Sequence, residues 1–318
     1  MKNFRTDLAL EMHESQEGEL SGVEITTEED DGITVTWVEI TDETGATAMG
    51  KPIGNYITLE SQAMKFGDTE AHEEIAKILA AKLGRLHNLN ENATILVVGL
   101  GNRNVTPDSL GPRICDKILV TRHLGEDVPD ELKGKLRAVS ALAPGVMGIT
   151  GIETAEIIRG VTEKISPDLV IAIDALAARS TARINATIQM SDAGVSPGAG
   201  LGNRRMAINS ETMGVPVIAV GVPTVVDAAT LVDDTMDKML SEMAQSLPQG
   251  NEFFAMLDAM QEGERYALIK EILMHDNMFV TPKDVDAVIY RLVNIIANAL
   301  NIALHPGITT DDLNRYVN

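Results

Sequence analysis

The chain has 318 residues, of which 44% are hydrophobic and 23% are charged, close to the globular averages of about 45–50% and 25%. This composition excludes a disordered chain and supplies enough apolar side chains for a buried core. The 26 Lys and Arg against 47 Asp and Glu give a net charge of −21, so the chain repels a phosphate backbone and direct nucleic-acid binding is not expected.

The cysteine content and the N-terminus indicate a cytoplasmic protein. Cys115 is the single cysteine, so neither an internal disulfide nor a cysteine-based zinc site is expected. The first residues lack the apolar core of a signal peptide. No apolar run approaches the roughly 18 residues of a membrane span, so we expect no membrane contact.

The first part of the chain changes from polar to β-like and then to helical patterning. The first twenty residues are polar and acidic without an apolar period, which predicts a loosely ordered leader. Residues 22–61 favour strands, because residues 33–40 are rich in β-branched side chains and turn residues follow at 42–45. Asp68 and Thr69 are candidate N-caps for a helix through Leu83, whose apolar residues recur at helical spacing.

From residue 94 onward, short apolar runs alternate with helical stretches. We expect strands at residues 95–98, 138–142, 169–173 and 215–220, and helices near 109–120, 151–165, 226–245, 253–260, 264–274 and 283–300. Apolar strands separated by helices are typical of a parallel sheet that is covered on both faces. The pattern predicts one α/β domain with a mostly parallel sheet, helices on both faces, an N-terminal β extension and a helical C-terminal part.

Two aspartates follow predicted strands. Asp108 lies in the glycine-containing segment after the first strand of the alternating region, and Asp174 directly follows the third. In an open α/β sheet the site lies beyond the carboxyl ends of the strands. Two close carboxylates raise the pKa of one of them, which leaves one acid and one base to activate water. Asp108 and Asp174 are therefore candidates for such an acid–base pair.

Structural roles stay open for both aspartates. Asp108 precedes an apolar helix and is equally suited to be its N-cap, and Asp174 is suited to cap the loop that follows it. Gly99 and Gly101 do not complete a dinucleotide fingerprint, because position 104 is Asn, so no nucleotide cofactor is expected. The glycine-rich segments 143–151 and 191–203 are either loops that contact a ligand or simple turns.

The histidines and the cysteine offer no second site. No histidine stands at a predicted strand end and there is no H-E-x-x-H motif, so no metal ligands are expected. Cys115 lies in a predicted helix without a nearby histidine, which favours a buried structural thiol over a nucleophile. The absence of G-x-S-x-G argues against a serine hydrolase elbow.

At this point four segments of the chain closely resemble the germination protease family of endospore-forming bacteria. These segments are residues 98–112, 143–154, 171–180 and 221–227. The first includes Asp108 and the third includes Asp174. The likeness extends from the leader at 5–9 to the tail at 280–286 and 300–305. It therefore covers nearly the whole chain.

The resemblance implies an endopeptidase that begins to degrade small acid-soluble spore proteins in the cytoplasm of the forespore and spore core. It implies a zymogen that trims its own N-terminus, a homotetramer, and an atypical aspartic peptidase in which Asp108 and Asp174 activate water, without cofactor or metal. The fold is similar to that of hydrogenase-maturation proteases, where corresponding acids and a histidine hold a metal. The alternatives are a metal-dependent protease of that type, a nucleoside- or nucleotide-binding α/β enzyme, and a non-catalytic spore protein.

The leader contains a candidate self-cleavage site. According to the resemblance, substrates are cut after an acid and before a large aliphatic or aromatic residue, with Ala next, Thr before and Glu beyond. Residues 6–11, Thr-Asp-Leu-Ala-Leu-Glu, fit this description, whereas the acid–aliphatic steps at 24–25 and 39–40 lack the Ala and lie in predicted strands. We expect cleavage between Asp7 and Leu8, giving propeptide 1–7 and a peptidase domain 8–318. The alternative is a frayed terminus with Asp7 as an N-cap.

Overall fold

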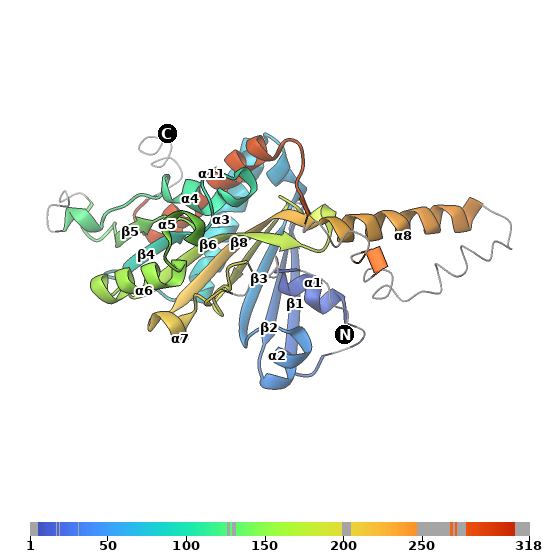
Figure 1. Cartoon of the computed structure of the whole chain (residues 1–318). Helices are drawn as coiled ribbons and strands as arrows, with labels where there is room; N and C mark the ends of the chain where they lie inside the picture. Colours follow the sequence, from blue (N-terminus) through green and yellow to red (C-terminus); the bar gives the residue numbers. More distant parts are fainter. Residues whose placement is uncertain are drawn as a thin grey trace.

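A computed structural model gives the structure of the protein and describes residues 6–16, 18, 20–30, 32–125, 128, 132–198, 205–246, 268–269, 271 and 278–308. In these residues nine strands form one sheet, in the order β1-β2-β3-β7-β8-β6-β4-β5, with β9 paired to β8 (Figure 1). The strands are β1 (Val23–Asp30), β2 (Ile33–Ile40), β3 (Gly54–Glu60), β4 (Thr94–Gly99), β5 (Ala138–Leu142), β6 (Leu169–Ala178), β7 (Thr187–Ser191), β8 (Val217–Asp227) and β9 (Phe279–Val280).

The sheet is mixed, so the expectation of a mostly parallel sheet was wrong. Parallel pairing joins β5, β4, β6 and β8, and the remaining pairs from β1 to β7, β7 with β8, and β8 with β9 are antiparallel. The cause is β7, which follows a turn at Asn185 with φ 59° and runs back beside β8. Because β7 also pairs with β3, the N-terminal strands are continuous with the sheet rather than an extension of it.

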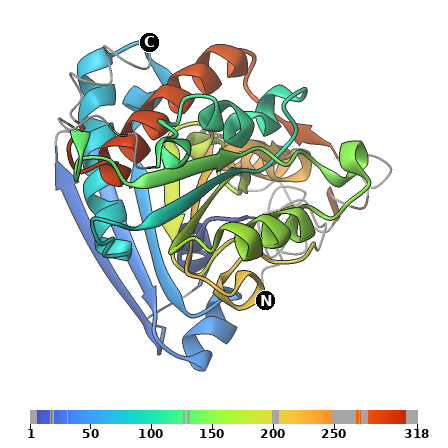
Figure 2. The same ribbon diagram turned by 90° about the vertical axis from the view of Figure 1, so that its left-hand side faces the viewer.

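Helices cover both faces of the parallel half, as the apolar runs predicted. On one face, α3 (Thr69–Leu86), α4 (Leu110–Cys115) and α11 (Val285–Leu304) pack against one another and bury the main core, to which Ile95, Val97 and Ile171 contribute from the sheet. On the other face, α6 (Thr154–Ile165) and α7 (Ser210–Met213) cover alternate residues of β4 and β6. Figure 2 shows α11 above the sheet and α6 below it.

The expected strands and helices form at the predicted places, with changes in length. Asp68 caps α3 by accepting a hydrogen bond from the Ala71 N–H at 3.1 Å. β4 and β5 agree with the expected runs, whereas β6 and β8 continue several residues further than their most apolar parts. This extension matters for the site, because it carries both strands beyond the end of β4.

The expectation of a loose leader is wrong for the part that the structure describes. Residues 9–14 form the helix α1 (Ala9–Glu14), and Leu8 is 0% exposed. Leu8 packs against Leu176 and Ala178 of β6. Its neighbour Ala9 packs with Val38 and other residues beside α2 (Glu43–Met49). The leader segment is therefore an integral part of the fold from Thr6 onward.

The C-terminal part is helical where it is described. α8 (Ala228–Ser246) extends away from the sheet (Figure 1), and α11 agrees with the helix expected near 283–300. The helix expected at residues 253–260 and most of the helix expected at 264–274 lie outside the described residues. Among the described helices, α11 alone has the length and the apolar composition that a membrane-spanning helix would need. In the structure it is a core helix, packed against α3 and α4.

Candidate active site

Asp174 lies inside β6 rather than at its end. β6 continues to Ala178, while the neighbouring β4 ends at Gly99, which pairs with Ile173. Asp174 is therefore the first residue of β6 beyond the carboxyl end of β4, which is where ligands bind in open α/β sheets. Its side chain is 7% exposed and accepts a hydrogen bond from the N–H of Ala175 at 3.0 Å. The loop-capping alternative for Asp174 does not apply, because no loop begins there.

Glycines bring the segment after β4 close to Asp174. The N–H of Leu100 donates to the carbonyl oxygen of Ile173 at 2.8 Å, which holds the turn against β6. Gly101 has φ +106°, and a Cβ there would lie 2.1 Å from the carbonyl oxygen of Asp108. A Cβ on Gly111 would lie 2.6 Å from the carbonyl oxygen of Ile173. Only glycine at these positions lets α4 and the turn before it pack this closely on β6.

Asp108 ends the 3₁₀ helix η2 (Thr106–Asp108) and accepts a hydrogen bond from the N–H of Asn102 at 2.7 Å. It does not cap α4: the N-cap of α4 is Ser109, which makes no side-chain capping bond. The N-cap alternative for Asp108 is therefore wrong. The hydroxyl of Thr224 on β8 donates to the carbonyl oxygen of Pro107 at 2.7 Å, and this bond ties η2 to the central strands.

The two aspartates are electrostatically coupled. Burial raises the pKa of Asp174 well above its ordinary value, and the negative charges of Asp108 and Asp7 raise it further. Burial also raises the pKa of Asp108, against the opposing effect of the Asn102 N–H. The positive charge of Arg205 lowers the pKa of both carboxyls in part. Two carboxyls that interact in this way favour one shared proton, which would leave one acid and one base.

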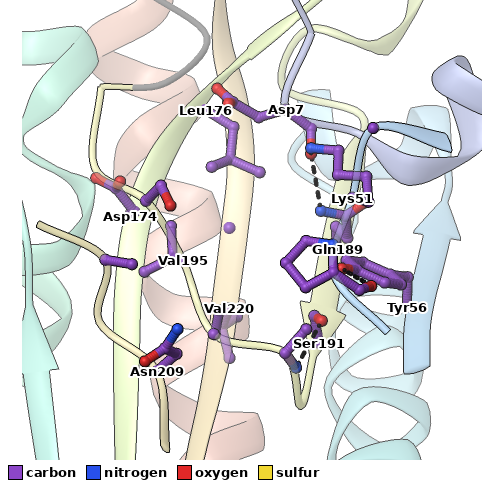
Figure 3. A pocket seen from close by; sticks show the side chains of 18 residues that line it. Asp7, Lys51, Tyr56, Asp174, Leu176, Gln189, Ser191, Val195, Asn209 and Val220 are labelled. Atoms are coloured by element: carbon purple, nitrogen blue, oxygen red, sulfur yellow. Dashed lines mark hydrogen bonds between the residues drawn. The ribbon is translucent and has the colours of Figure 1, made fainter. Parts of the chain in front are cut away.

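A cavity of about 210 Å³ opens beside Asp174 (Figure 3). Its walls come from the loop before β3, from β6, β7 and β8, and from the segment after β7, and include Lys51, Tyr56, Asp174, Gln189, Ser191 and Asn209. In Figure 3 Asp174 lies on the left of this space, Lys51 and Gln189 lie on the right, and Asp7 lies at the top. Asp108 does not line the cavity; it lies near enough to Asp174 to raise its pKa.

The proposed cleavage site, Asp7–Leu8, is bound at this cavity. The N–H of Asp7 donates to the carbonyl oxygen of Ala177 at 3.0 Å, and the Asp7 carboxylate accepts from the N–H of Ala177 at 2.9 Å. The carbonyl oxygen of Asp7 accepts from Lys51 Nζ at 2.8 Å and from Gln189 Nε2 at 3.1 Å. Asp7 is not the N-cap of α1, which is Leu8. The frayed-terminus alternative therefore fails for these residues.

Ion pairs hold α1 next to the cavity. The carboxylate of Glu11 accepts hydrogen bonds from the N–H groups of Arg179 at 2.7 Å and Ser180 at 2.9 Å. The Arg183 guanidinium bonds Glu14 of α1 at 2.5 and 2.7 Å and Glu60 of β3 at 2.7 Å. These charge-assisted bonds fix α1 to β3 and to the segment that follows β6.

The other candidates take structural places or stay outside the cavity. Burial raises the pKa of Cys115 to about 12, and its Sγ lies 3.5 Å from the carbonyl oxygen of Leu142, which is typical of an inert thiol. His305 is buried and contacts the carbonyl oxygen of Leu119. Of the two glycine-rich segments, 191–203 contributes cavity residues, Gly194 and Ser196 among them, whereas no residue of 143–151 lines it.

The described residues contain no group of three or more His, Cys, Asp and Glu side chains suited to hold a metal ion. Asp108 and Asp174 therefore lack, in this part of the chain, the histidine that would complete a metal-binding set. Within the described residues, the two aspartates therefore do not fit the metal centre that was expected from hydrogenase-maturation proteases.

The sequence did not point to Lys51, Gln189 or Arg205. Lys51 lies in a loop 123 positions before Asp174, and Gln189 belongs to the strand that was not expected. Both meet Asp7 only because β3 and β7 pair. The one available signal was the glycine-rich segment 191–203, which ends two residues before Arg205 and marked a part of the chain able to approach a ligand.

Comparison with known proteins agrees with the resemblance over the whole chain. A family model described as Germination protease matches residues 3–253 and 247–317. A germination protease of Caldanaerobacter subterraneus subsp. tengcongensis is 49% identical over 315 residues, covering 98% of this chain and 97% of the relative. One from Clostridium tetani is 49% identical over 99% of this chain and 100% of the relative. One from Bacillus cereus is 42% identical over 99% of this chain and 97% of the relative.

Proposed function

The chain belongs to the germination protease family, and from that premise we propose that it is an endopeptidase that begins the degradation of small acid-soluble spore proteins. Membership itself makes it a protease of spore germination. The observation that carries the aspartic mechanism is the coupling of Asp108 and Asp174 beside a cavity, with the pKa of both carboxyls raised.

In the proposed reaction the two carboxyls share one proton. Asp174, whose pKa is raised the more strongly, carries that proton, and Asp108 is ionised. Water adds to the carbonyl carbon of the substrate peptide and gives its proton to the ionised carboxylate. The tetrahedral intermediate then collapses, the C–N bond breaks, and the protonated carboxyl gives its proton to the leaving nitrogen. After the two transfers the pair again holds one proton.

We further propose that the protein is made as a zymogen and cuts itself between Asp7 and Leu8, which removes propeptide 1–7 and leaves domain 8–318. The Asp7–Leu8 peptide lies at the same cavity as Asp174, in an extended segment held along β6. The competing acid–aliphatic steps support this choice, because Glu24–Ile25 lies in β1 and Glu39–Ile40 lies in β2. A paired strand cannot enter a protease site without unfolding.

A homotetramer in the cytoplasm of the forespore and spore core completes the proposal. It rests on family membership and on apolar side chains of α8 that are exposed in the single chain, namely Leu231, Val232 and Met239. Isolated exposed apolar residues are common, whereas several along one helix favour an interface. Light scattering at micromolar concentration tests it, since a monomer contradicts the tetramer.

The function is tested with purified protein and a purified small acid-soluble spore protein, with fragments identified by mass spectrometry. We expect endoproteolytic cuts after acidic residues, in the presence as well as the absence of a strong chelator. Complete loss of activity in the chelator, restored by added metal, would support the maturation-type metal protease instead. No cleavage under any condition would contradict the peptidase function.

A further inference from the structure

The carbonyl oxygen of Asp7 has two side-chain donors. Lys51 Nζ lies 2.8 Å from it and Gln189 Nε2 lies 3.1 Å from it. This oxygen belongs to the Asp7–Leu8 peptide, the bond that the proposed function has the protein cut. Lys51 comes from the loop between α2 and β3 and Gln189 from β7, so the two donors reach the oxygen from separate elements.

Both donors are held in position. The side chain of Gln189 is buried, and its Oε1 accepts from the N–H of Ala9 at 2.7 Å, which fixes the direction in which Nε2 points. Lys51 is partly buried at the cavity wall. Burial lowers the pKa of its ammonium group, and the negative charges of Asp7 and Glu11 oppose that effect. Its positive charge thus stands in a partly desolvated place, where a developing negative charge is stabilised most.

The residues on either side of the bond are also held. On the N-terminal side, the N–H of Ala177 donates to the Asp7 carboxylate at 2.9 Å. On the C-terminal side, the Leu8 side chain packs against Leu176 and Ala178. The segment is therefore bound as a protease binds substrate, with an acid before the bond, an aliphatic residue after it, and donors on the carbonyl oxygen between them.

We infer that Lys51 and Gln189 are catalytic residues that stabilise the oxyanion formed from the carbonyl oxygen before the cut bond, in self-processing and in peptide substrates. This inference rests on the proposed function. When water adds to the carbonyl carbon, the π electrons of the C=O bond move onto the oxygen, and the two donors strengthen their bonds to it. When the C–N bond breaks, the electrons return to form the product carbonyl, so neither donor has to lose its proton.

The test compares the full-length wild type with Lys51→Met, Lys51→Arg and Gln189→Leu. Lys77→Met is the matched control, because Lys77 lies on α3 and pairs only with Glu74 among the described residues. The first-order rate of self-processing is followed by mass spectrometry. Variants that do not process are trimmed by a trace of wild-type enzyme, and the mature proteins are assayed for kcat and KM on a peptide with the sequence of residues 3–14.

Loss of one oxyanion donor typically lowers kcat by about 100-fold to 1,000-fold. We expect such a fall for Lys51→Met and Gln189→Leu, with KM changed less than about tenfold, partial recovery in Lys51→Arg, and a wild-type rate in Lys77→Met. If circular dichroism shows that Lys51→Met does not fold, the kcat values of Gln189→Leu and Lys51→Arg test the oxyanion role instead.

Failure of the oxyanion role can be distinguished from failure of the proposed peptidase function. If wild type cuts but Lys51→Met and Gln189→Leu keep kcat within about threefold, the oxyanion role is wrong and the peptidase function stands. A rise in KM alone also contradicts it, because it shows binding without stabilisation of the transition state. If wild type cuts nothing, the proposed function is wrong and the inference falls with it.

Discussion

Asp7 and Ala177 are joined by two hydrogen bonds, one in each direction. The Asp7 N–H donates to the Ala177 carbonyl oxygen at 3.0 Å, and the Ala177 N–H donates to the Asp7 carboxylate at 2.9 Å. The second bond uses the acidic side chain, so the main chain of β6 offers a donor to an acid before the Asp7–Leu8 bond.

Replacing Asp7 should therefore slow self-processing without harming the enzyme. We expect Asp7→Ala to reduce the rate of self-processing at least tenfold, because a hydrogen bond to a charged group contributes about 1.5–3 kcal/mol. Asp7→Glu should retain most of the rate. Mass spectrometry of the N-terminus measures both. The protein that begins at Leu8 lacks residue 7, so trimmed Asp7→Ala and trimmed wild type are the same enzyme. Self-processing of full-length Asp7→Ala at the wild-type rate would contradict the role of the Asp7 carboxylate.

The buried carboxyl of Asp174 predicts a gain in stability on neutralisation. Its pKa in the folded protein is raised above the ordinary value of 3.8. An acid whose pKa is raised in the folded state contributes stability that is present below its ordinary pKa. This contribution is lost as the pH rises through the raised pKa. Asp174→Asn removes this loss, so at pH 7 its melting temperature should exceed that of wild type, by about 1–2 °C for each kcal/mol gained in a chain of 318 residues.

The difference in melting temperature between Asp174→Asn and wild type should shrink toward pH 4 and vanish below it. Thermal unfolding by circular dichroism at both pH values measures it. The control Glu163→Gln neutralises an acid on the exposed face of α6, and its melting temperature should follow wild type at each pH. An Asp174→Asn protein that is less stable than wild type at pH 7 would show that the carboxylate is ionised and well solvated.

Gly101 should tolerate no side chain. Gly101→Ala places a Cβ 2.1 Å from the carbonyl oxygen of Asp108, at φ +106°. We expect a stability loss of about 1–3 kcal/mol in chemical denaturation and at least a tenfold loss of peptidase activity, because relief of the clash displaces Asp108. Gly84→Ala, in α3 with nothing within 4 Å of its Cβ, should stabilise by about 0.5–1 kcal/mol and leave activity unchanged. Equal activity in the two variants would contradict the role of the turn.

The ion pairs of Arg183 should hold α1 in place. Arg183→Met removes its bonds to Glu14 and Glu60, and we expect amide exchange of residues 8–14 to become at least tenfold faster, with slower self-processing. Hydrogen–deuterium exchange with mass spectrometry measures this directly. Arg159→Met, which breaks an exposed pair on α6, serves as the control. Unchanged exchange in Arg183→Met would mean that the other contacts of the segment, such as those of Glu11 and Leu8, hold it without Arg183.

The sequence predicted the parallel half of the sheet well because its strands are buried on both faces. Uninterrupted apolar runs such as that of β4 identify such strands without any knowledge of their neighbours. β7 was missed, because Thr-Ile-Gln-Met-Ser is short and includes polar residues. Its burial results from pairing with β3 and β8, which lie far away in the sequence. The mixed topology followed from that single strand.

The site was predicted only in part for the same reason. Asp108 and Asp174 were identifiable because each follows an apolar run of the sequence, and the topology of the sheet then brings both beyond the carboxyl end of β4. The leader was taken as loose, since nothing local to residues 6–14 indicates order. Its order comes from Arg183 and Gln189, more than 160 positions away, and from the apolar surface of β6. Contacts of this range leave no periodic trace in the sequence.

The most direct test of the account is the mass of the N-terminus in full-length Asp108→Asn and Asp174→Asn proteins, compared with wild type after the same incubation. An amide occupies nearly the same volume as the carboxyl but cannot ionise to act as base. We predict that wild type begins at Leu8 and that both variants remain uncut, with circular dichroism spectra like that of wild type. A folded Asp108→Asn or Asp174→Asn protein that loses residues 1–7 at near the wild-type rate, free of other proteases, would contradict it.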